Sequence, residues 1–255
     1  QISFFTYGGD DDVACAEAFP WLKVIPLYRG GTAPKSKWAR LYASLRAPSK
    51  CATELKRSDV YRSNQMLGAW VPALAAHLHR KKFICRIGYE WASTMAKVGR
   101  SQIYLWVAHF VSRLVYRAAD RIIVTSPRIA EQIQAEYSIS ESKISILPNF
   151  IDTDLFRPAS ISVQENFVLY VGRLSTEKNL DVLIRACAKA QTALVLIGSG
   201  PEESMLRALA QELSAQVKFL GTLSNLEVSK WLSRATIFAL ISQYEGNPKA
   251  LLEAM

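Results

Sequence analysis

The sequence predicts an α/β protein with two Rossmann-like units, and three observations support this prediction. In the second part of the chain, short apolar runs alternate regularly with segments of helical spacing. The first part shows the same alternation with longer helical stretches. Between them, residues 148–164 mix Pro, Asn, Asp and Ser without periodicity, which is typical of a linker. A chain of 255 residues has room for two domains, and we expect them at 1–157 and 158–255.

Five apolar runs of the first part are expected to be strands, because each is short and lies between longer stretches of helical periodicity. They are residues 2–5, 24–27, 83–87, 121–125 and 144–147. The wider apolar segment 103–111 contains His109, and it is followed by the charged residue Arg113. Because a membrane span needs about 20 apolar residues, we expect this segment to form a helix that is buried or seeks an interface.

Four buried strands are expected in the second part, at residues 167–171, 193–197, 217–220 and 237–241. A single segment of helical spacing separates each strand from the next, and Ser224 and Glu227 have the spacing of a capping box. This alternation implies right-handed crossovers and a parallel sheet. The chain stops soon after Pro248, which is expected to open a helix, so we expect the second domain to be incomplete.

Composition restricts the class of protein further. Half of the residues are hydrophobic and 21% are charged, which excludes a disordered or low-complexity chain. The four cysteines are spaced too widely for a dense disulfide framework or a metal knuckle. They are Cys15, Cys51, Cys85 and Cys187. We therefore expect a reducing compartment, and a cytoplasmic protein.

The net charge of +9 belongs to the first part of the chain. Residues 1–157 carry 22 Lys and Arg against 13 Asp and Glu, whereas residues 158–255 carry nine of each. Residues 29–62 hold nine basic and two acidic residues, interleaved with Trp38 and Tyr42. This pattern fits either a solvated basic face or a surface that meets anionic lipid. We expect no nucleic-acid partner, because no supporting motif accompanies the charge.

Two basic residues follow the first strand of the second part. Arg173 and Lys178 leave the carboxyl end of that strand and flank the start of a helix, so they can converge with helix amides on a diphosphate. The alternative is that they pair with Glu177 or Asp181. After the next strand, Gly198 lies in a turn where glycine lets a ligand approach the backbone, although chain reversal alone also accounts for such a turn.

Two carboxylates bracket the start of the last helix. If Asn247 caps this helix and Pro248 opens it, Glu245 lies in the preceding loop and Glu253 in the second turn. The amides near residues 249–251 then face a phosphate, and each carboxylate accepts hydrogen bonds from hydroxyls at one end of the ligand. A nucleotide-sugar has this layout. The alternative is that both glutamates only favour the helix dipole.

Four motifs of the second part, in this order, resemble the donor-binding half of a retaining glycosyltransferase of family 4. They are Val171-Gly172-Arg173-Leu174 with Lys178, Ile197-Gly198-Ser199-Gly200-Pro201, Val217-Lys218-Phe219-Leu220-Gly221, and the Glu-x7-Glu signature from Glu245 to Glu253. The first part resembles the family more loosely, through residues 120–126 and 147–152. The resemblance implies the GT-B fold, in which two Rossmann-like domains with parallel sheets face each other across a cleft.

The resemblance also implies a role for each matched position. Arg173, Lys178 and Glu245 would be catalytic, because the two cations neutralise the donor diphosphate while Glu245 holds hydroxyls of the transferred sugar. Glu253 would bind the ribose hydroxyls. The remaining donor-binding residues would be Gly198, Gly246, Asn247 and Leu251.

The implied reaction is the transfer of a hexose from a UDP- or GDP-sugar to a polysaccharide or glycolipid acceptor. Members of the family usually need no metal ion or other cofactor, because cations and a helix N-terminus stabilise the charge on the leaving diphosphate. The acceptor hydroxyl would enter on the face from which the nucleotide leaves, with retention of configuration. We expect such an enzyme in the cytoplasm, peripheral on the inner face of the membrane.

The sequence departs from the family pattern in three places. The glycine-rich loop after the family's first strand would precede Gln1, and the final strands and terminal helix would follow Met255. Where many members carry a His, this chain has Gly88, which leaves Arg86 or Glu90 as cleft candidates. Two other functions stay open: a nucleotide-sugar epimerase of the same architecture, and a non-catalytic module that binds only nucleotide or membrane.

Overall fold

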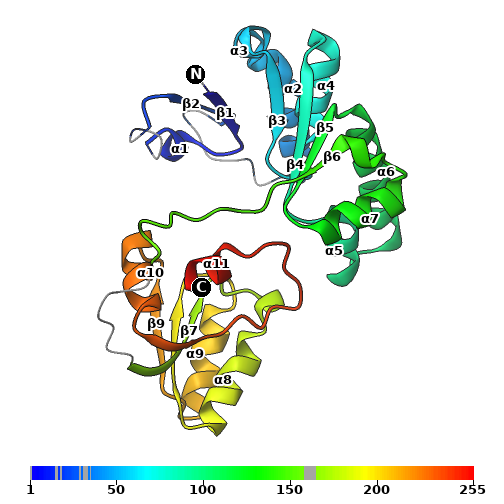
Figure 1. Cartoon of the computed structure of the whole chain (residues 1–255). Helices are drawn as coiled ribbons and strands as arrows, with labels where there is room; N and C mark the ends of the chain where they lie inside the picture. The colour runs from blue at the N-terminus through cyan, green and yellow to red at the C-terminus, as the bar shows by residue number, and fades with distance from the viewer. Residues whose placement is uncertain are drawn as a thin grey trace. The chain divides into compact units, whose positions relative to one another are not determined.

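The structure is a computed structural model that describes residues 2–14, 17, 19–28, 30, 34, 36–157 and 165–255. The chain forms two compact units, residues 1–147 and 148–255 (Figure 1). Both units are parallel α/β structures, as the alternation of apolar runs and helical segments predicts. Cys15, and Arg29 and Lys35 of the basic segment, lie outside the described residues.

The first unit contains a two-stranded sheet of β1 and β2 and a four-stranded sheet of order β3-β4-β5-β6, and all its strand pairs are parallel. The strands are β1 (Ile2–Thr6), β2 (Leu22–Pro26), β3 (Val60–Ser63), β4 (Lys82–Ile87), β5 (Arg121–Val124) and β6 (Ile144–Ile146). The helices are α1 (Asp10–Ala14), α2 (Lys37–Lys50), α3 (Ala52–Arg57), α4 (Trp70–His79), α5 (Trp91–Lys97), α6 (Gln102–Ala118) and α7 (Pro127–Tyr137), with a 3-10 turn η1 (Glu141–Lys143).

The sequence did not predict β3. This strand has four residues and alternates between exposed and buried positions, with Tyr61 buried and Val60 exposed. So short an alternation gives little periodic signal, and pairing with β4 decides that the segment is a strand. The other five strands of the first unit lie where the apolar runs predict them.

The core of the first unit forms where one face of β4 meets the helices. Phe83, Cys85 and Ile87 alternate along β4 and are buried, and Tyr116 of α6 and Ile133 of α7 belong to the same cluster. Burial of the Cys85 thiol raises its pKa to about 12.

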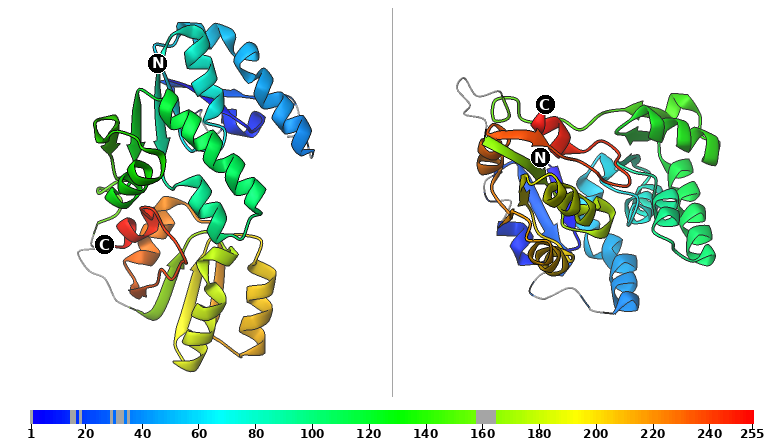
Figure 2. Two further views of the ribbon diagram at one scale, coloured as in Figure 1. Left: turned by 90° about the vertical axis from the view of Figure 1, so that its right-hand side faces the viewer. Right: turned by 90° about the horizontal axis from the view of Figure 1, so that it is seen from below.

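The helix α4 lies between α2 and α6 and contacts both (Figure 2).

The apolar segment 103–111 lies inside α6. Its helix begins after Ser101, whose Oγ accepts a hydrogen bond from the Tyr104 amide at 3.4 Å. One side of α6 is buried through residues such as Ala108 and Val115, and the other side is exposed. In the part of the chain that the structure describes, no helix has both the length and the apolar character that crossing a membrane requires.

The second unit holds a parallel sheet of order β10-β7-β8-β9. Its elements are β7 (Glu165–Val171), η2 (Thr176–Lys178), α8 (Leu180–Lys189), β8 (Ala193–Ile197), α9 (Glu203–Glu212), β9 (Val217–Gly221), α10 (Asn225–Leu232), β10 (Ala235–Phe238) and α11 (Lys249–Ala254). The predicted capping box is confirmed, because the Ser224 and Glu227 side chains each bond the other's backbone amide. The fourth strand ends at Phe238, before the predicted residue 241, and the chain then turns toward the loop after β7.

The first unit ends at Leu147, earlier than the boundary expected after residue 157. The intervening residues contact the second unit: Ser229 of α10 donates from Oγ to the Leu155 carbonyl at 2.8 Å, and Phe156 packs against the cluster that contains Phe167. A segment without periodicity therefore belongs to the unit on which it packs, which only the tertiary structure determines.

Candidate active site

The loops that follow β7, β8 and β9 leave the same edge of the sheet and are joined by backbone hydrogen bonds. The Gly172 amide donates to the Ile197 carbonyl at 2.9 Å, and the Gly198 amide donates to the Gly221 carbonyl at 2.7 Å. The Leu174 amide reaches the next loop in the same way. In parallel α/β sheets this carboxyl edge is where ligands bind, so the loops form a rigid base for a site.

Gly198 is required by this packing. Its φ of +130° disfavours other residues, and a Cβ atom at this position would lie 1.9 Å from the Gly172 carbonyl oxygen. The turn at Gly198 is therefore a close contact between two loops of the protein itself. Its role in binding a donor stays a prediction.

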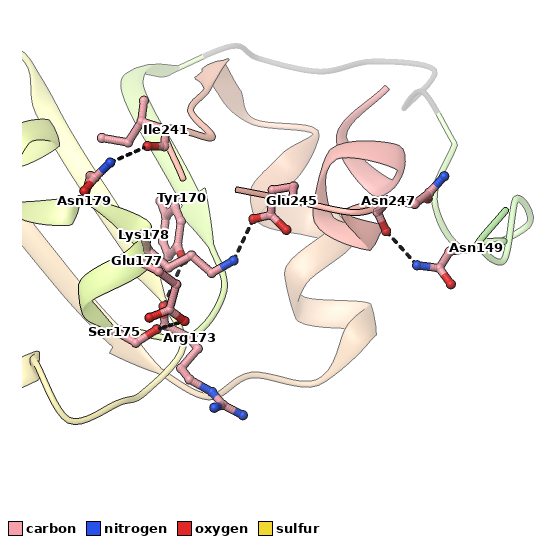
Figure 3. A network of polar contacts seen from close by, with 10 residues as sticks. All are labelled: Asn149, Tyr170, Arg173, Ser175, Glu177, Lys178, Asn179, Ile241, Glu245 and Asn247. Atoms are coloured by element: carbon pink, nitrogen blue, oxygen red, sulfur yellow. Dashed lines mark hydrogen bonds and ion pairs between the residues drawn. The ribbon is translucent and has the colours of Figure 1, made fainter. Parts of the chain in front are cut away.

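Lys178 and Glu245 meet at this edge (Figure 3). Lys178 Nζ lies 2.6 Å from Glu245 Oε1, and their side chains are only 18% and 26% exposed. Lys178 ends η2 after β7, whereas Glu245 comes from the loop before α11. The contact joins the two motifs that were predicted to form one site, because the ion pair holds both side chains at the same point.

Asn179 and Gln243 hold the loop that carries Glu245. Asn179 has a left-handed backbone and donates from Nδ2 to the Ile241 carbonyl at 3.0 Å, while Gln243 Nε2 donates to Asn179 Oδ1 at 3.1 Å. The Gln243 amide also donates to the Glu177 carbonyl at 2.9 Å. Neither residue was predicted from the sequence. An Asn directly before a helix was the available signal, since Asn tolerates this backbone conformation.

Arg173 is not part of the Lys178–Glu245 contact. Its side chain is exposed, points away from Lys178 (Figure 3), and makes no hydrogen bond or ion pair with any residue that the structure describes. The Arg173 carbonyl accepts a hydrogen bond from the Tyr170 hydroxyl at 2.9 Å, which fixes the backbone. Burial, with the nearby carboxylates of Glu245 and Glu177, raises the pKa of Tyr170, so this phenol stays a neutral donor.

Glu177 supplies a further negative charge beside the two cations. Its Oε1 accepts a hydrogen bond from Ser175 Oγ at 2.6 Å. Burial would raise the pKa of Glu177, but this hydrogen bond and the charges of Lys178 and Arg173 hold it below its ordinary value. The carboxylate therefore stays ionised. The alternative expected from the sequence was that Arg173 or Lys178 pairs with Glu177, but Glu177 bonds Ser175 and Lys178 bonds Glu245.

The last helix starts differently from the prediction. Pro248 has an extended backbone and is the residue before the first helical position, and no side chain caps the helix. The expectation that Asn247 caps and Pro248 opens the helix is wrong, because the chain is still extended at Pro248. The Leu251 amide was predicted to face a phosphate. In the structure it donates a hydrogen bond to the Pro248 carbonyl at 3.2 Å. The Asn247 carbonyl accepts a hydrogen bond from Asn149 Nδ2 at 2.6 Å (Figure 3). Gly246 is half-buried.

Glu253 lies on α11 and is half-buried. Burial raises the pKa of its carboxyl, and the nearby Lys249 partly opposes this effect. Among the described residues it makes no hydrogen bond or ion pair, with Lys178 or with any other side chain. The binding of ribose hydroxyls by Glu253 stays a prediction.

The two cleft candidates of the first unit have different surroundings. Arg86 is half-buried on β4 and donates from Nη1 to Asn64 Oδ1 at 3.3 Å. Glu90 is 3% exposed, caps α5 by accepting the Ser93 amide at 2.6 Å, and accepts the Tyr137 hydroxyl at 2.7 Å. The Glu90 carboxylate therefore has a structural role, which leaves Arg86 as the candidate on this strand.

A pair of hydroxyls at the same edge of the second sheet was also not predicted from the sequence. Ser199 Oγ, after β8, lies 3.3 Å from Thr222 Oγ1, after β9. Hydroxyls at two adjacent strand ends can donate to or accept from a polar ligand. Among the described residues, no three His, Cys, Asp or Glu side chains gather as a metal site would require.

Two family models together match the chain from end to end. The model for glycosyltransferase family 4 matches residues 1–155, and the model for glycosyl transferases group 1 matches residues 152–255. The chain belongs to glycosyltransferase family 4. The family expected from the four motifs is thereby confirmed, and the two matches meet close to the boundary between the two units of this glycosyltransferase.

Curated relatives of this glycosyltransferase are transferases with longer chains. A 154-residue stretch is 34% identical to the N-acetylgalactosamine-N,N'-diacetylbacillosaminyl-diphospho-undecaprenol 4-alpha-N-acetylgalactosaminyltransferase of Campylobacter jejuni, covering 58% of this chain and 42% of that protein. A 153-residue stretch is 29% identical to the D-inositol 3-phosphate glycosyltransferase of Mycobacterium bovis, covering 53% of this chain and 32% of that protein. The chain thus spans less than half the length of these relatives.

Solved structures share the fold. Sucrose-phosphate synthase of Thermosynechococcus elongatus superposes with a TM-score of 0.78 at 20% identity, over 99% of this chain and 78% of that one. Anabaena Alr3699/HepE, solved in complex with UDP and glucose, superposes with a TM-score of 0.72 at 19% identity, over 99% and 77% of the two chains. These likenesses confirm the expected α/β, GT-B fold class.

Proposed function

We propose that this chain forms the donor-binding and acceptor-side units of a retaining glycosyltransferase that moves a hexose from a UDP- or GDP-sugar to a polysaccharide or glycolipid acceptor. The observation that carries the proposal is the contact between Lys178 Nζ and Glu245 Oε1 at 2.6 Å. It brings a cation for a diphosphate and a carboxylate for sugar hydroxyls to the carboxyl edge of one parallel sheet. An Anabaena structure of the same fold is in complex with UDP and glucose, which supports this class of donor.

The proposed chemistry uses residues of this edge. The acceptor oxygen forms a bond to the anomeric carbon while the bond from that carbon to the diphosphate oxygen breaks, and the electron pair leaves with the diphosphate. The acceptor proton passes to that diphosphate oxygen. Lys178 leaves Glu245 to neutralise the charge that develops there, and Arg173, whose exposed side chain has no bond to break, joins it. We propose no metal ion for this step, because two cations supply the charge.

Glu245 has the second role in the proposal. Released from Lys178, its carboxylate accepts hydrogen bonds from hydroxyls of the transferred sugar and holds the anomeric carbon in position. Glu253, Gly198, Gly246, Asn247 and Leu251 complete the donor site. The acceptor is proposed to be lipid-linked or a polysaccharide, at the inner face of the membrane, since the Campylobacter relative is named for transfer to a diphospho-undecaprenol acceptor.

The test is transfer by the purified protein and by Glu245→Gln, which keeps the shape of the side chain but removes its charge. Nucleotide release and sugar transfer to added acceptors are followed by mass spectrometry, and the anomeric configuration of the product by NMR. We expect Glu245→Gln to lower kcat by about 100-fold with the fold retained, because a preorganised electrostatic contact at the reacting centre is lost. The matched control is Glu203→Gln, which removes an exposed ion pair with Arg207 on α9 and leaves kcat unchanged.

Three results would contradict the proposal. Interconversion of free nucleotide-sugars without transfer would indicate the epimerase. Nucleotide binding that is unaffected by Glu245→Gln, with no transfer to any acceptor, would indicate the binding module. A product of inverted configuration would support a glycosyltransferase but contradict the retaining mechanism.

A further inference from the structure

Three neighbouring helices of the first unit turn apolar side chains to the solvent. α4 contacts both α2 and α6 (Figure 2), and each helix also has a buried side, for example at Ala75 and Ala76 of α4. The large exposed side chains include Trp38, Leu41, Tyr42 and Leu45 on α2, Leu74 and Leu78 on α4, and Ile103, Trp106, Val107, Phe110 and Leu114 on α6. We call these outward sides the helical face. Large apolar residues gathered on adjacent helices mark an interaction surface.

The most exposed of these side chains are too open to belong to the core. Trp38 is 81% exposed, Ile103 79% and Trp106 69%. Trp106 and Phe110 also stack on each other, with ring centroids 5.7 Å apart and an interplanar angle of 7°. Ile103, Trp106, Phe110 and Leu114 follow helical spacing, so they form one continuous row on the side of α6 opposite its buried residues.

The charge of the same helices is of one sign. α2, α4 and α6 contain no Asp or Glu, whereas their Lys and Arg residues are Lys37, Arg40, Arg46, Lys50, Arg113 and Arg117. On α2 the Arg46 guanidinium donates to the Tyr42 hydroxyl at 3.0 Å and lies 5.6 Å from the centre of its ring. Helices that lie in the plane of a lipid interface combine an apolar row with cations on long stems in this way.

We propose that the helical face docks on an anionic lipid bilayer. A second copy of the chain is a poorer occupant, because a two-fold interface would set the same cations opposite one another. Anionic headgroups attract the cations beside the apolar residues, such as Arg46 and Arg117, and the bilayer takes up the tryptophan and phenylalanine rings below the headgroups. The proposal extends the basic segment 29–62, of which α2 forms part, to α4 and α6. It is independent of the proposed transfer reaction, because docking needs neither donor nor acceptor.

The test is sedimentation of the protein with phosphatidylcholine vesicles, with and without phosphatidylglycerol, at low and high salt and without any nucleotide-sugar. We expect binding that requires phosphatidylglycerol and weakens with salt. Arg46→Ala with Arg117→Ala should weaken it by about fivefold for each cation removed. Trp106→Glu with Phe110→Glu should abolish it, and the milder Ile103→Ser should weaken it. The matched control is Leu226→Glu on α10 of the second unit, which is 56% exposed and should bind as the parent does.

Equal binding to neutral and anionic vesicles would overturn the proposal. Unchanged binding by Trp106→Glu with Phe110→Glu, in a variant whose circular dichroism and Tm match the parent's, would also overturn it. Light scattering tests whether a second copy of the chain binds the helical face instead. If the same substitutions convert an oligomer to a monomer and leave vesicle binding unchanged, the helical face joins two copies of the chain.

Discussion

Asn149 donates a hydrogen bond from Nδ2 to the backbone carbonyl of Asn247 at 2.6 Å, across 98 positions of the sequence. The segment that leads into β7 thereby holds the end of the loop that carries Glu245. The other end of this loop is held by the bond from the Gln243 amide to the Glu177 carbonyl. The position of Glu245 is thus set from two sides, by residues that do not touch its carboxylate.

Asn149→Ala is expected to weaken donor binding. A neutral hydrogen bond contributes about 1 kcal/mol, so we expect a loss of stability of that size and a several-fold higher KM for the donor, because a long-range bond that positions the loop is lost. The control is Ser229→Ala, which removes the bond from Ser229 Oγ to Leu155 on the same segment, away from the loop. It should lower the Tm in a similar way without changing KM; an equal rise in KM would contradict a specific role for Asn149.

Gly198→Ala is expected to destabilise the second unit strongly. The new Cβ atom would lie 1.9 Å from the Gly172 carbonyl, which is backbone and can move only by opening the joined loops. Gly221→Ala is the matched control, because Gly221 also has a positive φ but has nothing within 4 Å of its Cβ position. We expect about 1 kcal/mol of destabilisation for the control and markedly more for Gly198→Ala in urea unfolding. Similar losses would show that the loops can separate easily.

Glu253→Gln is expected to raise stability and to weaken donor binding. Burial raises the pKa of Glu253, so its charged form is disfavoured in the folded state, and this cost is present at pH above its unfolded pKa of about 4.3. A neutral Gln removes the cost at pH 7, and the Tm should rise, with the difference from the parent disappearing below pH 4.

The same substitution removes a charged acceptor for ribose hydroxyls, which should raise the Kd of the nucleotide roughly tenfold in calorimetry. Glu212→Gln, at the exposed end of α9, is the control and should change neither quantity. A higher Tm with an unchanged Kd would separate Glu253 from the donor site.

Asp120→Asn is expected to make the first unit less sensitive to acid. Asp120 accepts hydrogen bonds from Lys82 Nζ at 2.8 Å and from the Phe83 amide at 2.9 Å, and these lower the pKa of its carboxyl. Its stabilising effect is therefore complete above the unfolded pKa of about 4 and is lost as the pH falls through the lower folded-state pKa.

We expect Asp120→Asn to have a lower Tm than the parent at pH 7, by the equivalent of about 1 kcal/mol for a partly exposed pair, and to approach the parent near pH 3. Asp59→Asn is the control, since its side chain is 97% exposed and lies 4.0 Å from Lys81. A constant difference from pH 7 to pH 3 would contradict the assignment to this carboxylate.

Much of the fold follows from local patterns. The strands of the second unit are apolar runs bounded by turns, and α8 buries Leu180, Leu183, Ile184 and Cys187 at the predicted spacing. β3 and the start of α11 were not predicted correctly, because a four-residue strand needs its partner β4 and the extended Pro248 lies between two loops with long-range contacts. Local periodicity contains no information on either.

The sequence by itself determined the alternation of strands and helices and the family, because these depend on residue types and on their order along the chain. That Lys178 and Glu245 serve one donor site stays a prediction, which their contact supports. The tertiary structure decided that Lys178 and not Arg173 turns to Glu245, that Gly198 is pressed against Gly172, and that α6 leaves Trp106 in the solvent. The direction of a side chain depends on the backbone conformation at its own residue. At this site that conformation is set by hydrogen bonds from residues far away in the sequence, such as those of Asn149 and Asn179.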